Sequence, residues 1–268
     1  MPGRPPPLDR TARRLLERLP FRARLALLSL YRRQPLPRWG NLRRTRPFSE
    51  TWGFERGTPV DRMYMERFLE RNAGDVRGEA LEVMNADYLH RYGGSRLTRA
   101  HVVDVDPDNP LATIVADLSE PGSLPVDSFD CVVLTQTLQL VPDVRAALEN
   151  VWASMRPGGV LLVSVPTITP VDRTSRGFDR WRFTADGLRT AVSQACPRAD
   201  IEVEAFGNAS AGVAFLMGIA VEELRMRQVE TFDPDVAILA CARIRKPASL
   251  DRKDVADTDL DERSSRDS

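Results

Sequence analysis

From residue 49 onward, apolar residues recur in a pattern that alternates between strand-like and helix-like segments. The runs 129–135 and 160–165 are almost wholly apolar, which is typical of parallel strands buried on both faces. The run 201–205 alternates apolar residues with glutamate, which predicts a strand with one exposed face. Further short apolar runs predict strands at 80–84, 101–105, 113–116 and 236–242.

Between these strands, apolar residues recur at the spacing of a helix. Helices are expected at 59–72, from the N-cap Asp143 onward, and at 184–194. We expect the second of these helices to end at the Pro157-Gly158-Gly159 turn, because neither residue type readily continues a helix. Strands that alternate with helices in this way predict an α/β fold, with a mainly parallel sheet and helices on both of its faces.

Three segments are expected: a basic N-terminal extension at 1–47, a main domain at 48–246 and a disordered, acidic-leaning tail at 247–268. The extension holds thirteen arginines, no lysine and two acids. Leucines between residues 15 and 31 interleave with arginines and predict an amphipathic helix, which Pro20 interrupts. Two interpretations of this helix remain open. It contacts an anionic membrane or a partner protein, or it packs on the main domain with its arginines in solvent.

Composition argues against several classes of function. The formal net charge is zero, so the molecule as a whole gives no case for nucleic-acid binding. The three cysteines, Cys131, Cys196 and Cys241, are far apart and the chain has two histidines, so neither a disulfide framework nor a metal site is expected. Neither a run of eighteen apolar residues nor a signal-peptide pattern is present, so the expected location is the cytoplasm.

Polar side chains follow the predicted strands at their carboxyl ends, where sheets of this kind bind ligands. Glu82 lies in the first strand, Asp106 comes after the second and Asp117 after the third, while Thr135 and Gln136 end the fourth. An acid after the second strand can accept hydrogen bonds from both hydroxyls of a ribose. An aspartate after the third can accept from an adenine amino group. In this order and spacing, the residues indicate a nucleoside-bearing cofactor.

A series of short motifs runs through residues 78 to 195: Ala116-Asp117-Leu118, Leu124-Pro125, Ser128-Phe129-Asp130, Leu138 to Val141, Leu148, Arg156-Pro157-Gly158-Gly159, Asp179, Trp181-Arg182-Phe183-Thr184 and Leu188. Together these motifs resemble class I S-adenosylmethionine-dependent methyltransferases of the type 11 group. Ahead of them, Trp52-Gly53 and Arg56-Gly57-Thr58-Pro59 are similar to methyltransferase-like proteins of bacterial glycan and secondary-metabolite gene neighbourhoods.

The resemblance implies a Rossmann-like, doubly wound sheet of about seven strands, the last one antiparallel, with S-adenosylmethionine lying across the first four. It implies that Asp106 holds the ribose, that Asp117 reaches the adenine edge and that Leu118 packs against the adenine ring. Asp104 competes for the ribose, but its position between two alternating valines favours Asp106. The cofactor-binding residues implied in this way are Glu82, Asp106, Asp117, Leu118, Thr135 and Gln136, the last two lining the methionine end.

The first loop departs from the family pattern. The family reads acid-x-Gly-x-Gly-x-Gly there, whereas residues 82–88 read Glu-Val-Met-Asn-Ala-Asp-Tyr, with none of the three glycines. Glycine permits tight turning and a close approach of the backbone to the cofactor. Either the loop takes another path, or the affinity for the cofactor is reduced or lost. If the loop follows the family path, replacing Met84 and Ala86 by glycine tightens cofactor binding.

Methyl transfer from a sulfonium needs mainly proximity and orientation from the protein. A general base is needed only for a poorly acidic hydroxyl or a protonated amine. The candidate catalytic residues are Gln136, Asp179, Trp181 and Arg182, with Gln139 also near the expected acceptor. Plainer interpretations are a core or lid role for Trp181 and a surface ion pair between Asp179 and Arg182.

The segment between the last two strands is long, and its apolar half spans residues 209–220. We expect a helix there, over the mouth of the cleft beside Trp181 and Gln136, forming part of an acceptor pocket or a dimer contact. The alternative is that this segment extends the core.

Two functions follow from the sequence. The first is an enzyme that transfers a methyl group from S-adenosylmethionine to a small-molecule or sugar-like acceptor. The second is a non-catalytic binding or scaffold protein with a methyltransferase fold that has lost the cofactor. The acids after the second and third strands favour the enzyme, and the loop without glycines favours the scaffold.

Overall fold

The computed structural model describes residues 10–32 and 40–248 of the 268-residue chain. The chain divides into two compact units, Met1–Arg46 and Pro47–Ser268. In the first unit, α1 (Arg10–Glu17) and α2 (Phe21–Arg32) flank Pro20, as the lack of an N–H on proline predicts, and η1 (Gly40–Leu42) follows. The predicted tail lies outside the described residues from residue 249 on. Among the described residues, no helix is both long and apolar enough to span a membrane.

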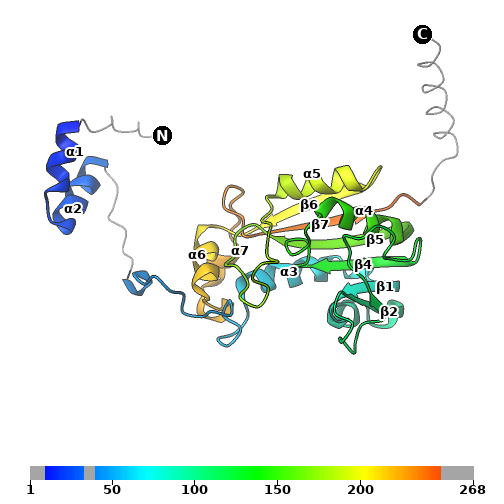
Figure 1. Ribbon diagram of the computed structural model, residues 1–268. Helices are drawn as coiled ribbons and strands as arrows, with labels where there is room; N and C mark the ends of the chain where they lie inside the picture. The colour runs from blue at the N-terminus through cyan, green and yellow to red at the C-terminus, as the bar shows by residue number, and fades with distance from the viewer. Residues whose placement is uncertain (1–9, 33–39, 249–268) are drawn as a thin grey trace, which may run out of the picture. The chain divides into compact units, whose positions relative to one another are not determined.

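The second unit is built on a seven-stranded sheet in the order β3-β2-β1-β4-β5-β7-β6 (Figure 1). Its strands are β1 (Gly78–Val83), β2 (Leu97–Asp104), β3 (Ile114–Val115), β4 (Phe129–Thr135), β5 (Met155–Pro166), β6 (Asp200–Phe206) and β7 (Leu239–Arg245). The pairs from β3 to β5 are parallel, and β7 is antiparallel to both of its neighbours. The expected Rossmann-like α/β fold with seven strands and an antiparallel last strand is confirmed.

Helices cover both faces of this sheet (Figure 1). One face carries α4 (Val144–Ser154) and α5 (Ala185–Ala195), and the other carries α3 (Val60–Arg71), α6 (Ala209–Met217) and α7 (Met226–Glu230). Because successive side chains of a strand point to opposite faces, each strand feeds both cores. In β1, for example, Leu81 packs with α4 and α5, while Ala80 packs with α3 and α6. The short helical turns are η2 (Ala73–Asp75), η3 (Leu89–Gly93), η4 (Gly94–Arg96) and η5 (Val221–Glu223).

Two helix starts follow their sequence signals. The Asp143 carboxylate accepts a hydrogen bond from the Ala146 amide at 3.0 Å and caps α4. The Thr184 hydroxyl accepts one from the Gly187 amide at 3.0 Å and caps α5. These side chains satisfy amides that have no partner within the helix.

The predicted end of α4 was wrong. The helix stops at Ser154, and the Pro157-Gly158-Gly159 turn lies inside β5. There β5 bulges, because Met155 pairs with Phe129 whereas Val160 already pairs with Cys131. A Cβ on Gly159 would come within 2.9 Å of the Arg156 carbonyl oxygen, and Gly158 has a φ of +81°. Glycine is therefore required to close the bulge, not to end the helix.

The helix predicted after the sixth strand is present as α6. It packs on α3 and α7, and its Phe215 side chain is only 2% exposed. The segment thus contributes to the core, as the alternative interpretation of the sequence expects, and the end of α6 also lines a pocket together with residues 170–176. The physical reason is that its apolar residues fill the sheet face beside α3.

Candidate functional site

The carboxyl ends of β2, β1 and β4 lie side by side in the sheet. The site residues predicted in and after these strands, with Asp117 just beyond the neighbouring β3, are therefore gathered along one edge. This edge is where parallel sheets of this kind bind ligands.

Met84 begins the loop that leaves β1, and its backbone is left-handed, with a φ of +70°. Its amide donates to the Val103 carbonyl at 3.0 Å, and its carbonyl accepts a hydrogen bond from the Asn109 side chain at 2.8 Å. Its side chain is 62% exposed. The chain thus adopts at Met84, the position of the first glycine in the family loop, a conformation that favours glycine.

Glu82 lies beneath this loop and is 3% exposed. Its carboxylate accepts hydrogen bonds from the Leu89 amide at 3.0 Å and from the Tyr88 amide at 3.4 Å. Burial raises the pKa of Glu82 from its ordinary value of 4.5 to about 7, although the Leu89 amide acts in the opposite direction. Glu82 therefore fixes the end of the loop from inside.

Asp104 and Asp106 have different surroundings at the end of β2. Both carboxylate oxygens of Asp104 are engaged, one by the Asp106 amide at 3.0 Å and the other by the Asn109 side chain at 2.7 Å. Asp106 is exposed, and one of its oxygens accepts from the Asp108 amide at 2.9 Å. Its second oxygen makes no hydrogen bond within the described part of the chain. Of the two acids, Asp106 is the one with an oxygen available to a ligand.

The end of β3 presents Asp117, which is half-buried and accepts a hydrogen bond from the Ser119 amide at 2.8 Å. The Leu118 side chain is buried in the core beneath it. A ring lying at this edge would meet the backbone of Leu118 and not its side chain.

Two glutamines follow β4. Gln136 has a φ of +48°, and its amide donates to the Ser164 carbonyl at 2.9 Å. The Gln139 side-chain nitrogen donates to the Gln136 carbonyl at 2.7 Å and to the Gln136 side-chain oxygen at 3.1 Å. These bonds fix the direction of both side-chain amides. Thr135, the last residue of β4, is half-buried, and its carbonyl accepts a hydrogen bond from the Thr137 hydroxyl at 2.9 Å.

Four buried side-chain atoms in the described part of the chain have no hydrogen-bond partner, and three of them lie at this edge. They are Gln136 Nε2, Gln139 Oε1 and, one residue beyond β5, Thr167 Oγ1. Gln139 is only 8% exposed. Because an unpaired buried polar group is costly, such atoms after two neighbouring strands indicate a ligand or water that completes them.

The segment 167–183, which follows β5, closes over the glutamines. The Gln139 carbonyl accepts hydrogen bonds from the amides of Arg180 at 2.8 Å and Trp181 at 3.2 Å. The Trp181 ring nitrogen donates to the Val141 carbonyl at 2.9 Å. Trp181 is thus held against the segment that follows β4, and its side chain is partly exposed.

Asp179 and Arg182 form a paired anchor in this segment. The Arg182 guanidinium donates to both Asp179 oxygens, and the Asp172 amide also donates to Asp179 at 3.0 Å. The Arg182 guanidinium holds the pKa of Asp179 below its ordinary value. The carboxylate is almost wholly covered, so this pair positions the segment and leaves no free oxygen for a general base.

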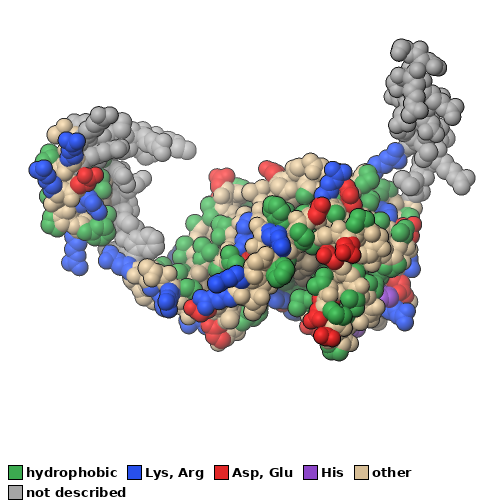
Figure 2. Space-filling view, in the orientation of Figure 1, with side chains coloured by type: hydrophobic (Ala, Val, Ile, Leu, Met, Phe, Trp, Pro, Cys, Tyr) green, Lys and Arg blue, Asp and Glu red, His purple; other side chains and the backbone are tan. Residues whose placement is uncertain are grey.

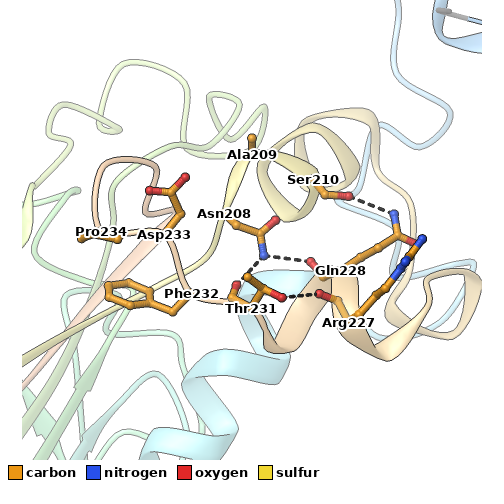
Figure 3. A pocket seen from close by; sticks show the side chains of 9 residues that line it. All are labelled: Asn208, Ala209, Ser210, Arg227, Gln228, Thr231, Phe232, Asp233 and Pro234. Carbon is orange, nitrogen blue, oxygen red and sulfur yellow. Dashed lines mark hydrogen bonds between the residues drawn. The ribbon is translucent and has the colours of Figure 1, made fainter. Parts of the chain in front are cut away.

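A separate, open depression of about 460 Å³ lies between the start of α6 and α7 (Figure 3). Its polar groups bind one another, since the Asn208 side chain donates to the carbonyls of Gln228 and Thr231 and the Gln228 side chain donates to Ser210. None of the predicted site residues lines it. Its hydrogen bonds join the two helices. Among the described residues, no cluster of three or more His, Cys, Asp or Glu could hold a metal ion.

Sequence reasoning missed Asn109 and Thr167. Asn109 lies in a stretch with two prolines that is typical of a turn, and its bond to Met84 joins residues 25 positions apart. Thr167 has no sequence signal, because its unpaired hydroxyl depends on which groups surround it.

Residues 41–195 match the model of a family described as a methyltransferase domain. The match spans more than half of the chain, so this chain belongs to that family. The class is that of the class I S-adenosylmethionine-dependent methyltransferases, as the sequence motifs predicted, and S-adenosylmethionine is the cofactor of the class.

Among curated proteins, the carboxy-S-adenosyl-L-methionine synthase of Geobacter metallireducens is 41% identical over 64 residues, 23% of this chain and 25% of that protein. That of Vibrio cholerae is 38% identical over 68 residues, 25% of this chain and 26% of that protein. The match therefore spans about a quarter of the length of these relatives.

Solved structures with a similar fold include the N-methyltransferase NodS from Bradyrhizobium japonicum in complex with S-adenosyl-L-homocysteine. It is 17% identical, with a TM-score of 0.46, over 77% of this chain and 94% of that chain. A methyltransferase from Mesorhizobium loti is 20% identical, with a TM-score of 0.45, over 70% of this chain and 98% of that chain. At such low identities and TM-scores, these structures support no conclusion beyond the fold described above.

Proposed function

We propose that this protein transfers a methyl group from S-adenosylmethionine to a small-molecule or sugar-like acceptor. The observation that carries the proposal is the pair of unpartnered atoms after β4. Gln136 Nε2 is a donor and Gln139 Oε1 is an acceptor. The methionine end of the cofactor presents a carboxylate and an ammonium group, which these two atoms complement.

The remaining cofactor contacts follow along the same edge. Asp106 offers its free oxygen to the ribose, and Asp117 accepts from the adenine amino group. The buried side chain of Leu118 leaves its backbone to face the ring. Glu82 contributes indirectly, because its hydrogen bonds hold the loop that follows β1. Thr135 contributes as the residue that leads into the Gln136 turn.

The bound cofactor supplies an activated methyl group. The chain's own residues bind and orient the two reactants and exclude water, which is what an in-line displacement requires of a protein. Trp181 and the segment around it cover the glutamines, and the Asp179–Arg182 pair holds that segment in place. This arrangement suits acceptors that are reactive without a strong general base.

The names of the curated relatives also refer to a derivative of S-adenosylmethionine. Their similarity is local, so it supports a related cofactor and not the same reaction.

A test of this proposal is calorimetry with S-adenosylmethionine and S-adenosylhomocysteine. Both should bind, and Gln136→Met should weaken them about tenfold or more, the scale of a hydrogen bond to a charged group. Gln194→Met, at an exposed position of α5, is the matched control and should bind as the parent does. Absence of binding at millimolar ligand would leave the non-catalytic scaffold, which the loop without glycines favours.

A further inference from the structure

A pocket of about 270 Å³ lies beyond the carboxyl end of β5. Its walls come from three places: residues 47–52, the segment 170–176 that follows β5, and the end of α6. Trp52, Pro170 and Phe215 give it apolar walls, and Arg173 and Arg176 stand at its rim. We call it the Trp52 pocket.

The Trp52 pocket adjoins the proposed methyl-donor site. β5 is the direct neighbour of β4, where Thr135 pairs with Ser164. Thr167, whose hydroxyl lacks a partner, is three residues before Pro170 of the pocket wall, a span of roughly 10 Å at most. The Trp52 ring nitrogen also bonds the Thr169 hydroxyl at 3.2 Å. A molecule in the pocket therefore lies near the carboxyl end of β5, the strand next to β4.

Trp52 is held in an unfavourable backbone conformation, with a φ of +56°. The buried Ser49 enforces it, because its hydroxyl accepts hydrogen bonds from the Thr51 amide at 3.1 Å and the Gly53 amide at 2.8 Å. Next to it, a Cβ on Gly53 would lie 3.1 Å from the Gly218 carbonyl oxygen, so the turn is packed tightly on the end of α6. Bulky residues adopt this conformation only where the surroundings impose it, and such strain gathers at ligand sites.

The charges of the pocket leave one cation unpaired. The Arg173 guanidinium forms an ion pair with the Glu50 carboxylate, and both line the pocket. Arg176 is exposed and has no hydrogen-bond or ion-pair partner within the described ranges. An apolar wall with an aromatic ring and one free guanidinium matches a ring-bearing molecule with one anionic group.

We propose that the Trp52 pocket binds the methyl acceptor, and that the acceptor carries a carboxylate or phosphate that Arg176 binds while its ring packs on the apolar wall. This assignment rests on the proposed methyl transfer and names the substrate class for it. Trp52 and Arg176 are then specificity-determining residues, separate from the glutamines that face the donor.

The test uses two pairs of probes that differ in charge: 4-hydroxybenzoate against phenol, and glucose 1-phosphate against methyl glucoside. Calorimetry on the full chain, with and without S-adenosylhomocysteine, measures the affinity for each. One anionic probe should bind about 10- to 100-fold more tightly than its neutral partner, the range of a charge-assisted hydrogen bond. The pair that shows the difference distinguishes a carboxylate acceptor from a phosphate acceptor.

Three variants test whether Arg176 causes the preference for the anionic probe. Arg176→Gln should abolish it, Arg176→Lys should retain part of it, and Arg77→Gln, at an exposed arginine at the opposite edge of the sheet, should leave it unchanged. None of them should alter S-adenosylhomocysteine binding. If that ligand binds but neither anionic probe is preferred, or if the preference survives Arg176→Gln, the assignment of the pocket is wrong. If S-adenosylhomocysteine fails to bind, the proposed function fails, whatever the probes do.

Discussion

The backbone angle φ of Met84 has a value that favours glycine, the residue that the family has at this position of the loop after β1. The residue occupies the left-handed region at a φ of +70°, which costs a residue with a Cβ roughly 1–2 kcal/mol. Glycine would remove that cost but would add about 0.5–1 kcal/mol of entropy loss on folding. The side chain is exposed, so it contributes little packing that could compensate.

We therefore expect Met84→Gly to raise the free energy of unfolding by up to about 1.5 kcal/mol and to tighten S-adenosylhomocysteine binding. Ala86→Gly is the matched control for stability, since Ala86 has an ordinary negative φ. It should lower the free energy of unfolding by about 0.5–1 kcal/mol. Urea unfolding and calorimetry measure both quantities. Unchanged or weaker binding of S-adenosylhomocysteine by Met84→Gly would show that the loop has been rerouted.

The free oxygen of Asp106 leads to a second expectation. Asp106→Asn should weaken S-adenosylhomocysteine by about 1.5–3 kcal/mol, the scale for hydrogen bonds to a charged group. Asp108→Asn, two residues along the same exposed loop, should change the affinity little. Calorimetry at constant salt decides between them. A larger loss at Asp108 would exclude Asp106 as the ribose ligand.

Glu82 should make stability depend on pH. Because its pKa is raised from 4.5 to about 7, the native state holds the proton more tightly than the unfolded state does. The contribution of Glu82 to the free energy of unfolding should therefore fall as pH rises from 4.5 to 7, by at most about 1.4 kcal/mol per pH unit. Burial also raises the pKa of Asp61 from 3.8 to about 6, which adds a fall of the same sign at lower pH. Glu82→Gln should therefore remove the fall between pH 6 and 7, and Glu70→Gln, on the exposed side of α3, should not. Urea titrations from pH 4 to 8 test this.

The sequence predicted which residues reach the edge of the sheet, because strand ends can be read from apolar runs. It could not predict how those residues are engaged. Asp104 and Asp106 are both aspartates near one strand end, and only Asn109, folded back onto them, separates their surroundings. In the same way, Asp179 and Arg182 looked like surface candidates, but a turn in the chain covers the carboxylate.

Among the elements, α6 has a structural role because its Phe215 side chain is buried in the core. Phe215 is packed with Phe68 and Leu162, on the sheet face that α3 covers, and it also lines the Trp52 pocket. Phe215→Ala should lower the free energy of unfolding by about 3–5 kcal/mol, as for a buried phenylalanine. Leu216→Ala, at the exposed neighbouring position, should cost far less. Thermal and urea unfolding measure both. A small loss at Phe215 would return α6 to the role of a lid.

The sequence located every strand from β1 to β7, and the predicted N-cap, Asp143, is confirmed. The ends were less predictable, as the Pro157-Gly158-Gly159 turn shows. Proline and glycine indicate a break in regular structure, but they occur both at helix ends and in strand bulges, so the sequence alone does not distinguish the two. The pairing of Met155 with Phe129 made it a bulge, and that pairing depends on a partner strand distant in sequence.

At the scale of the whole molecule, charge is unevenly spread along the chain. Thirteen arginines and two acids lie before residue 47, although the full chain has 38 basic and 38 acidic residues. On the helices of this first unit, hydrophobic side chains lie beside Lys or Arg side chains (Figure 2). Phe21 and Leu30 are 57% and 77% exposed. This combination is typical of helices that bind anionic lipid.

We expect the full chain to sediment with vesicles containing phosphatidylglycerol and not with vesicles of phosphatidylcholine alone. The binding should weaken as salt rises, because screening reduces the attraction of arginine to anionic lipid. Phe21→Ser should reduce it, while Phe232→Ser, at an exposed phenylalanine of the second unit, should not. Absence of sedimentation with either kind of vesicle would favour the other interpretation of the sequence, in which the helix packs on the main domain with its arginines in solvent.

The strand order has a consequence for synthesis. β7, the last strand to be made, lies between β5 and β6, which are both made before it. Until residues 239–245 leave the ribosome, β5 has an open edge and β6 has no neighbour, so the nascent chain exposes apolar strands to other chains. A chain truncated before Leu239 should therefore be bound by chaperones and degraded by proteases. This should happen although β1, β2 and β4, whose ends form the proposed cofactor site, are already complete.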